Sequence, residues 1–299
     1  MRTPRSAVGA LTGATALALA LVATPTSAAA PGNAPDGVAS HAAARTVDQQ
    51  QAVVDYWTPE RMKNATPRGQ KVDPAKGKPV KAAAAEAVQV PVQPELGKVF
   101  FTLGGSNYVC SGTATDSANG DVVTTAGHCL NEGPGAYATN FAFVPAYDND
   151  SRPYGTWTAE TLLTPSAWAN SGDYNHDVGF AVMNENASGQ SLTDVVGSYP
   201  IGFDLGYNRT FEAYGYPAAS PYDGQDLWQC SGTAGVDTRG TTDHRLPCSM
   251  TGGSSGGGWI TDGTLNSVNS FGYRGETDVM YGPYFGSVEE DVYTTAASS

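Results

Sequence analysis

A run of small residues at positions 250–259 carries the side chain best suited to chemistry in this 299-residue chain. It reads Met-Thr-Gly-Gly-Ser-Ser-Gly-Gly-Gly-Trp, and no ordinary helix or strand tolerates so much glycine, because glycine costs backbone entropy and packs nothing. The run therefore predicts a specialised loop. Freely turning backbone around Ser255 suits a nucleophilic hydroxyl whose neighbouring N–H groups converge on an oxyanion. A flexible linker is the alternative interpretation.

Two other segments offer partners for this hydroxyl. His128 ends an apolar, β-branched run and precedes Cys129, and Asp177 begins another such run. A serine, a histidine and an aspartate can form a catalytic triad whatever their distance in sequence. All four histidines, at positions 41, 128, 176 and 244, precede Ser255. An α/β-hydrolase needs its histidine after the serine, and the subtilisin order begins with the aspartate, so the order favours the chymotrypsin arrangement.

The three motifs together resemble those of the chymotrypsin/trypsin-like serine endopeptidases of the secreted bacterial type. They are Thr125-Ala126-Gly127-His128-Cys129, Asp177-Val178-Gly179-Phe180 and Gly253-Ser254-Ser255-Gly256-Gly257. The resemblance implies an all-β fold of two antiparallel six-stranded β-barrels with the active site in the cleft between them. It also implies that Ser255 is the nucleophile of an acyl-enzyme mechanism, His128 the general base and Asp177 its orienting carboxylate. The backbone N–H groups of Gly253 and Ser255 would then form the oxyanion hole.

Other histidines and aspartates could compete for these roles. His176 precedes Asp177 on what we expect to be the same strand, so its side chain should point to the opposite side. His41 lies in a region expected to be extended or disordered, and His244 lies in a polar loop. Asp173 and Asp194 lie in polar turns, where aspartate is usually a solvated turn former.

The resemblance also places a specificity pocket. Its floor would lie near Ser249 and its wall at Ser270, Phe271 and Gly272. An uncharged Ser249 does not support cleavage after Arg or Lys, and Asn269 does not support cleavage after Glu. Ser254 stands where animal relatives have an aspartate that pairs with a new amino terminus, so that ion pair is not available to this chain.

Four cysteines in a secreted chain predict two disulfides, for which the sequence alone allows three connectivities. The resemblance implies that Cys129 pairs with Cys110, which leaves Cys230 with Cys248. No C-x-x-C spacing occurs, so metal binding by these cysteines is not expected. We expect no metal and no cofactor.

The amino-terminal residues predict export. Arg2 and Arg5 precede an apolar stretch that ends in small residues, which is typical of a signal peptide over residues 1–28. No second stretch is apolar enough to span a bilayer, so we expect a secreted, extracellular protein with no membrane partner. Residues 99–299 carry five arginines, no lysine and 22 acidic residues, a net charge of −17 that disfavours nucleic-acid binding.

Residues 29–97 are interpreted as a pro-segment and Pro-rich linker. Thr46 begins one predicted helix, and Thr58 with Pro59 begins a second. Residues 66–96 predict an exposed polyproline-like linker, with processing between about Lys81 and Lys98. This basic segment could dock on the acidic domain and block its cleft until it is removed. A helical appendage that stays on the mature protein is the alternative.

Residues 98–299 predict the peptidase domain, with barrels at roughly 98–190 and 191–290. Short β-rich runs with glycine-rich turns indicate an antiparallel barrel or sandwich, and residues 291–299 are expected to be a frayed tail. We therefore predict a monomeric secreted serine endopeptidase that acts on proteins or peptides. The alternatives are a catalytically inactive trypsin-like binding module and a β-sandwich carbohydrate binder, the latter suggested by 15 Tyr and 5 Trp.

Overall fold

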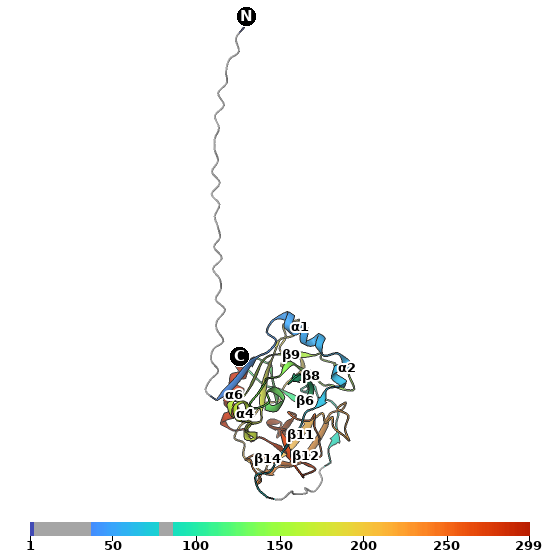
Figure 1. The fold of residues 1–299 in the computed structure, drawn as a ribbon, viewed down its shortest axis with the longest axis vertical. Coiled ribbons are helices and arrows are strands. Elements are labelled where there is room, and N and C mark those ends of the chain that lie inside the picture. The colour runs from blue at the N-terminus through green and yellow to red at the C-terminus, as the bar shows by residue number, and fades with distance from the viewer. Residues whose placement is uncertain (3–36, 78–85) are drawn as a thin grey trace. The chain divides into compact units, whose positions relative to one another are not determined.

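The computed structural model describes residues 1–2, 37–77 and 86–299. Apart from its first two residues, the predicted signal peptide lies outside the described residues. From Gly37 onward the described chain is mostly β-structure with short helices (Figure 1). None of the helices among these residues is long and apolar enough to cross a membrane.

The first half of the β-structure is a closed barrel. Its ring runs β5-β6-β7-β10-β9-β8 and closes by pairing of β8 with β5, every pair being antiparallel. The six strands are β5 (Leu96–Leu103), β6 (Ser106–Thr115), β7 (Val122–Thr125), β8 (Thr139–Pro145), β9 (Trp157–Pro165) and β10 (Gly179–Met183). The β5–β6 turn contains Gly104 and Gly105 with φ of 56° and 80°, a left-handed backbone that glycine adopts without strain.

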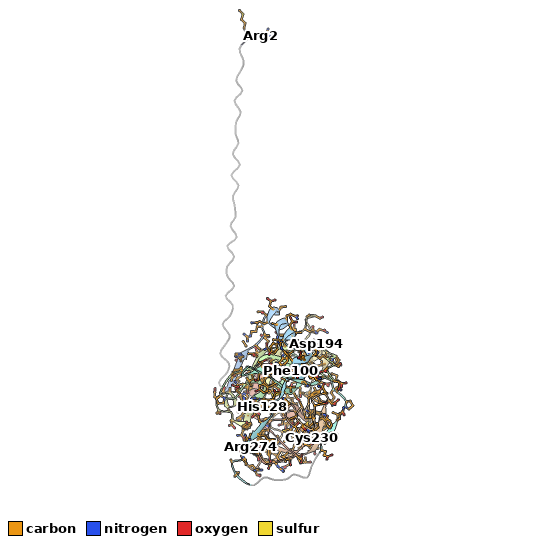
Figure 2. The ribbon with its side chains drawn as sticks, turned by 45° about the vertical axis from the view of Figure 1, so that its right-hand side comes forward. Arg2, Phe100, His128, Asp194, Cys230 and Arg274 are labelled. Atoms are coloured by element: carbon orange, nitrogen blue, oxygen red, sulfur yellow. A yellow bond between two sulfur atoms is a disulfide. The ribbon has the colours of Figure 1, made fainter. Side chains whose placement is uncertain are left out.

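The second half contains two five-stranded sheets, ordered β16-β15-β11-β12-β4 and β13-β14-β18-β17-β3. Its own strands are β11 (Thr210–Gly215), β12 (Trp228–Thr233), β13 (Gly235–Val236), β14 (His244–Pro247), β15 (Gly258–Thr261), β16 (Thr264–Val268), β17 (Phe271–Tyr273) and β18 (Val279–Gly282). The closed barrel followed by this second β-unit confirms the predicted all-β, two-barrel fold class. Figure 2 labels Phe100 in the first half and Cys230 in the second.

The amino-terminal residues add helices and strands to this body. Helices α1 (Val47–Tyr56) and α2 (Pro59–Lys63) begin after Thr46 and Thr58, whose hydroxyls accept hydrogen bonds from the backbone N–H groups of Gln49 and Arg61. Figure 1 shows both helices on the side of β8 and β9. Trp57, which follows α1, is buried and donates from Nε1 to the carbonyl of Asn140 at 2.6 Å.

One expectation for this region is confirmed in part, and another is wrong. Strand β1 (Val38–Ala42) pairs with β9, and the ring of His41 stacks on Tyr137 at 4.7 Å, so this stretch is extended, as one of the two alternatives had it, and not disordered. The described parts of residues 66–96, which are 66–77 and 86–96, are not a free linker, because their short strands pair with three strands of the two halves described above. These are β2 (Thr66–Pro67) with β6, β3 (Gln70–Val72) with β17 and β4 (Val88–Gln89) with β12. These strands are two or three residues long, which is too short for an alternating apolar pattern to show in the sequence.

The carboxyl-terminal residues form a helix rather than a frayed tail. Helix α6 (Ser287–Ala297) buries Val292 and Ala296, which are four residues apart and share one face. The side chain of Glu289 accepts a hydrogen bond from the N–H of Gly286, before the first turn. The shorter helices are α3 (Gly127–Leu130), α4 (Ser166–Ser171), α5 (Leu192–Val196) and the 3₁₀ turn η1 (Tyr174–His176).

Two disulfides fasten the two halves internally. Cys110 of β6 is bonded to Cys129 of α3, and Cys230 of β12 to Cys248, which follows β14. This is the connectivity that the family resemblance implies. Each closes a loop of 18 or 19 residues, which stabilises the fold by about 3 kcal/mol in the chain-entropy account.

Candidate active site

His128 and Asp177, both from the first half of the β-structure, form a buried hydrogen-bonded pair. Strand β7 delivers His128 at the start of α3, and Asp177 lies between η1 and β10. Nδ1 of His128 lies 2.8 Å from Oδ2 of Asp177, while the backbone N–H of His128 donates to Oδ1 at 2.8 Å. Both side chains are fully buried. The carboxylate therefore fixes the imidazole in orientation and favours the tautomer that carries its proton on Nδ1.

Asp177 receives a third hydrogen bond, from the hydroxyl of Ser270, which is also buried. Trp168 closes the other side of the site, with its ring centroid 6.4 Å from that of His128. A carboxylate with three donors stays positioned without a water molecule. Nε2 of His128 has no hydrogen-bond partner among the described residues, so this nitrogen is free to accept a proton.

The loop that carries Ser255 depends on glycine for close approach. Gly253 and Gly256 have φ of 98° and 81°, in the left-handed region. A Cβ on Gly256 would overlap Thr125 and the carbonyl of Ser111, and one on Gly257 would overlap the carbonyl of Tyr214. The glycines thus let the loop lie directly against β6, β7 and β11, and the flexible-linker interpretation does not apply.

Asn269, which directly follows β16, holds this loop in place. Its Nδ2 donates to the carbonyls of Ser254 (2.9 Å) and Tyr214 (2.8 Å), and its Oδ1 accepts from Nε1 of Trp259. Its backbone accepts from Gly256 N–H at 2.8 Å and donates to the Gly257 carbonyl at 2.9 Å. The buried Asn269 therefore spans both sides of Ser255, and no charged group is needed there.

The backbone of Ser255 lies close to the disulfide that flanks His128. The Ser255 carbonyl accepts from Ser111 N–H at 2.7 Å and is 3.9 Å from the Cys129 sulfur, which in turn is within 4.8 Å of a ring nitrogen of His128. The Ser255 hydroxyl donates to the carbonyl of Arg68 at 3.3 Å. The same carbonyl accepts from the N–H of Gly253 at 2.6 Å, so the predicted oxyanion donor already holds a carbonyl oxygen.

A cavity of about 260 Å³ lies next to Ser255. Four of its lining residues, Pro67, Gly69, Gln70 and Lys71, belong to the amino-terminal segment. The others are uncharged and are Met250, Thr251, Gly252, Ser254, Ser255, Ser270, Phe271, Gly272, Val279 and Met280. Three of the predicted pocket residues, Ser270, Phe271 and Gly272, are among them. The fourth, Ser249, is not: its hydroxyl accepts from Ala87 N–H at 2.9 Å and lies 3.1 Å from the Tyr222 hydroxyl.

The rival histidines are occupied elsewhere. His176 lies in η1 and not on a strand, and its Nδ1 is 2.6 Å from Glu289 of α6, whose hydrogen bond raises the His176 pKa. His244 is fully buried at the start of β14 among Phe211, Trp259 and other rings, so the expected polar loop is wrong there. Burial lowers the pKa of His244 to about 4.

The rival aspartates are structural. Asp173 accepts a hydrogen bond from the N–H of Asn175 at 3.0 Å and caps η1, and Asp194 lies in the first turn of α5.

Cys110, His128 and Cys129 lie close enough together to suggest metal ligands, but both sulfurs are used in the disulfide. The sequence did not predict two roles in the site. One is that of Asn269 in holding the Ser255 loop, since its side-chain hydrogen bonds leave no pattern in the sequence. The other is that of Arg68, which lies in the predicted linker.

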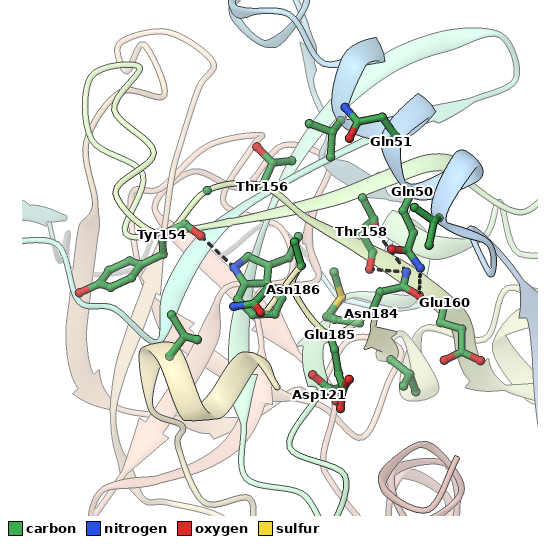
Figure 3. Close-up of a pocket in the computed structure, with 18 of the residues that line it drawn as sticks. Gln50, Gln51, Asp121, Tyr154, Thr156, Thr158, Glu160, Asn184, Glu185 and Asn186 are labelled. Atoms are coloured by element: carbon green, nitrogen blue, oxygen red, sulfur yellow. Dashed lines mark hydrogen bonds between the residues drawn. The ribbon is translucent and has the colours of Figure 1, made fainter. Parts of the chain in front are cut away.

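A larger cavity, of about 910 Å³, lies far from these groups, between α1 and strands β9 and β10. Figure 3 shows Gln50 of α1 reaching Asn184, to which its Nε2 donates at 2.9 Å, beside Glu160 and Asp121. Burial raises the pKa of Asp121 to about 6. Residues of α1 form one wall of this cavity, and none of the predicted catalytic residues lines it.

Solved structures similar to this chain include proteases. The crystal structure of the protease Anisep from Arthrobacter nicotinovorans is 52% identical with a TM-score of 0.69, covering 71% of this chain and 100% of its own. The thermostable serine protease AL20, from an extremophilic microorganism, is 45% identical with a TM-score of 0.67, covering 69% of this chain and 98% of its own. A Glu endopeptidase structure, 19% identical with a TM-score of 0.60, shares the fold over 74% of this chain and 100% of its own.

The other comparisons add little. No family model matches the chain. A curated protein, the extracellular metalloprotease of Bacillus subtilis (strain 168), is 32% identical over 79 residues, which is 26% of this chain. The matched segment spans about a quarter of that relative's length, 24%.

Proposed function

Because the chain belongs to the chymotrypsin/trypsin-like serine endopeptidases, we propose that it hydrolyses peptide bonds in proteins through Ser255, His128 and Asp177. The observation that carries the proposal is that Gly253 N–H already holds a peptide carbonyl at 2.6 Å beside the Ser255 hydroxyl, next to a buried His128–Asp177 pair. A donor aimed at a carbonyl oxygen stabilises the charge that develops there when a nucleophile adds.

The triad would act in the order that its geometry allows. Nε2 of His128 takes the Ser255 proton while Oγ attacks the substrate carbonyl, and Gly253 and Ser255 N–H groups hold the oxyanion. His128 then returns the proton to the leaving amine, which leaves an ester on Ser255. Water hydrolyses that ester by the same route. Asp177 stays ionised and stabilises the imidazolium formed in each step.

We further propose that the substrate residue on the acyl side of the cut is uncharged and apolar. Apart from residues of the proposed pro-segment, which include Lys71, the cavity beside Ser255 is formed by Met250, Val279 and Met280 together with the 250–252 and 270–272 segments. None of these residues carries a charge that could pair with Lys, Arg or Glu. Burial of an unpaired charge costs several kcal/mol. Mapping of cleavage sites in a denatured protein tests this: cuts mostly after Lys, Arg or Glu would contradict it.

We propose that the protein is secreted and that residues 29–97 include a pro-segment removed on maturation. The two disulfides fit an oxidising compartment. Lys98 is buried in β5, and β4 pairs with β12, so we place the cut before Ala87 rather than as late as Lys98. Amino-terminal sequencing of secreted protein tests this, and a mature chain that still begins near residue 29 would support the helical-appendage alternative.

Hydrolysis of casein by the purified, processed protein tests the activity. We expect turnover in wild type and a loss of about 10⁶-fold in Ser255→Ala, since the nucleophile is removed. Ser267→Ala is the matched control, because Ser267 is also buried in the second half but donates to the carbonyl of Pro283. No hydrolysis by folded, processed wild type would favour the inactive binding module.

A further inference from the structure

The active-site cleft contains a segment of the same chain, residues 66–72. Strand β2 pairs with β6 in parallel register, Thr66 opposite Tyr108 and Pro67 opposite Val109. Strand β3 then pairs with β17, also in parallel, Gln70 opposite Phe271 through Val72 opposite Tyr273. Between the two strands the chain passes Ser255. We infer that this segment is a ligand bound in the direction opposite to a substrate, which blocks the cleft and resists cleavage there.

Arg68 occupies the position of the reacting residue. Its carbonyl accepts from Gly253 N–H at 2.6 Å and from the Ser255 hydroxyl at 3.3 Å, while its own N–H donates to the Val109 carbonyl at 3.0 Å. The segment therefore uses the oxyanion donor and the nucleophile together. With its proton directed to Arg68, the Ser255 hydroxyl is not hydrogen-bonded to His128, and Nε2 has no partner among the residues described.

The direction of a productive substrate follows from the chemistry. His128 must protonate the leaving amine, so the amine side of the scissile bond must lie toward His128 and β6, which is joined to α3 by Cys110–Cys129. The acyl side must then lie toward the cavity and β17. A substrate thus runs from β17 to β6, from its amino to its carboxyl end. Residues 66–72 run from β6 to β17.

This reversal protects the bond after Arg68. The amide nitrogen of Gly69 lies on the β17 side of the carbonyl, away from the imidazole that would have to protonate it. The Arg68 side chain is likewise on the β6 side, with its guanidinium 4.9 Å from the ring of Tyr108. It does not line the cavity beside Ser255, whereas Gly69, Gln70 and Lys71 do.

Contacts on both sides hold the segment. Downstream of Arg68, Gln70 accepts from the Tyr174 hydroxyl at 3.3 Å, the Val72 carbonyl accepts from Arg274 N–H at 2.8 Å, and Asp73 pairs with Arg274 at 3.2 Å. Upstream, Met62 and Ala65 are buried against the first barrel. The docking therefore rests on strand pairing and apolar packing, rather than on the attraction between a basic segment and an acidic domain.

Gly69 offers a way to loosen the segment with one methyl group. A Cβ there would lie 3.0 Å from the Cα of Gly252, which is backbone and cannot rotate away. Gly69 does not have a left-handed φ, so Gly69→Ala adds the clash without backbone strain. Lys63→Ala is the control, because the Lys63 side chain is exposed at the end of α2 and does not line the cavity beside Ser255.

The inference rests on the proposed function, so the test uses the full chain with its processed form as an internal standard. Both forms are exposed in one sample to a fluorophosphonate, which labels an active serine, and are separated by size. We expect the processed form to label and the intact form to label far more slowly. Gly69→Ala should speed labelling of the intact form about tenfold, and Lys63→Ala should not.

Direction is tested in the same samples by mass spectrometry. Arg68→Met presents an apolar side chain that a forward-bound segment would place in the cavity and offer for cleavage. We expect the bond between residues 68 and 69 to stay intact in wild type and in Arg68→Met. Cleavage of that bond by the chain itself, or equal labelling of intact and processed forms, would overturn the inference while leaving the endopeptidase intact. Absence of labelling in the processed form would instead contradict the proposed function.

Discussion

The two halves of the cleft hold their catalytic groups by different means. In the first half, His128 and Asp177 are fixed by side-chain hydrogen bonds, three of which end on the one carboxylate. In the second half, Ser255 lies on a glycine loop fixed through its backbone by Asn269. The base must keep one tautomer, whereas the loop must keep its N–H groups aimed at one point. The first half therefore fixes the tautomer of the histidine, and the second half fixes the direction of the backbone N–H groups.

The buried histidines of the two halves show the same difference. His128 and His244 are both fully buried, but His128 has Asp177 at Nδ1, while neither ring nitrogen of His244 has a hydrogen-bond partner among the described residues. His244 packs as an aromatic ring against Phe211 and Trp259. Burial alone therefore does not make a base; a carboxylate that orients the ring does.

Among the variants considered, we expect Asp177→Asn, in the first half of the cleft, to lower turnover the most. An amide has one acceptor oxygen in place of two, so its NH₂ group can face Nδ1 and hold the imidazole in the wrong tautomer. We therefore expect turnover to fall about 10⁴-fold with little change in KM. Steady-state kinetics on a peptide substrate measure this. Asp173→Asn, at the cap of η1, should lose stability but not turnover. Equal losses in both variants would show that Asp177 is only structural.

Asn269→Ala tests the second half of the cleft, because it removes the side chain that holds the Ser255 loop. Without the hydrogen bonds to the Ser254 and Tyr214 carbonyls, the loop no longer holds the Gly253 N–H in the direction of the oxyanion. We expect kcat to fall about 10²-fold or more, which is the effect of losing one oxyanion donor. The matched control is Asn266→Ala, since Asn266 is equally buried on β16 but donates to the Gly202 carbonyl. Both variants should lower the melting temperature. A kcat that falls equally in both would remove the positioning role of Asn269.

His244→Phe sharpens the contrast between the histidines. The His244 pKa is lowered from 6.5 to about 4 by burial, so between these values the unfolded chain binds a proton that the folded chain does not. The wild-type fold therefore loses stability as pH falls from about 6.5 to 4, by about 3 kcal/mol from this group. Denaturant unfolding of wild type and variant at pH 7 and pH 4.5 measures this. The variant should lose less than wild type, and identical pH profiles would contradict the assignment.

The sequence was sufficient where residue type alone dictates structure. Glycines at 253, 256 and 257 and the order of His128, Asp177 and Ser255 predicted the loop and the family, and Thr46, Thr58 and Pro59 predicted where two helices begin. It was insufficient where tertiary contact decides. The register of residues 66–72 depends on backbone groups of β6 and β17, and Val292 and Ala296 acquire a burial surface only in the folded protein.

The most direct test of the central claim is to locate the covalent adduct that a fluorophosphonate forms on the processed protein. Two adjacent hydroxyls are available, and the Ser254 hydroxyl donates to the Thr251 carbonyl at 2.8 Å, whereas that of Ser255 points into the cleft toward Arg68. Tandem mass spectrometry should find the phosphonate on Ser255, and His128→Ala should abolish its formation. An adduct on Ser254, or labelling unchanged by His128→Ala, would contradict the triad.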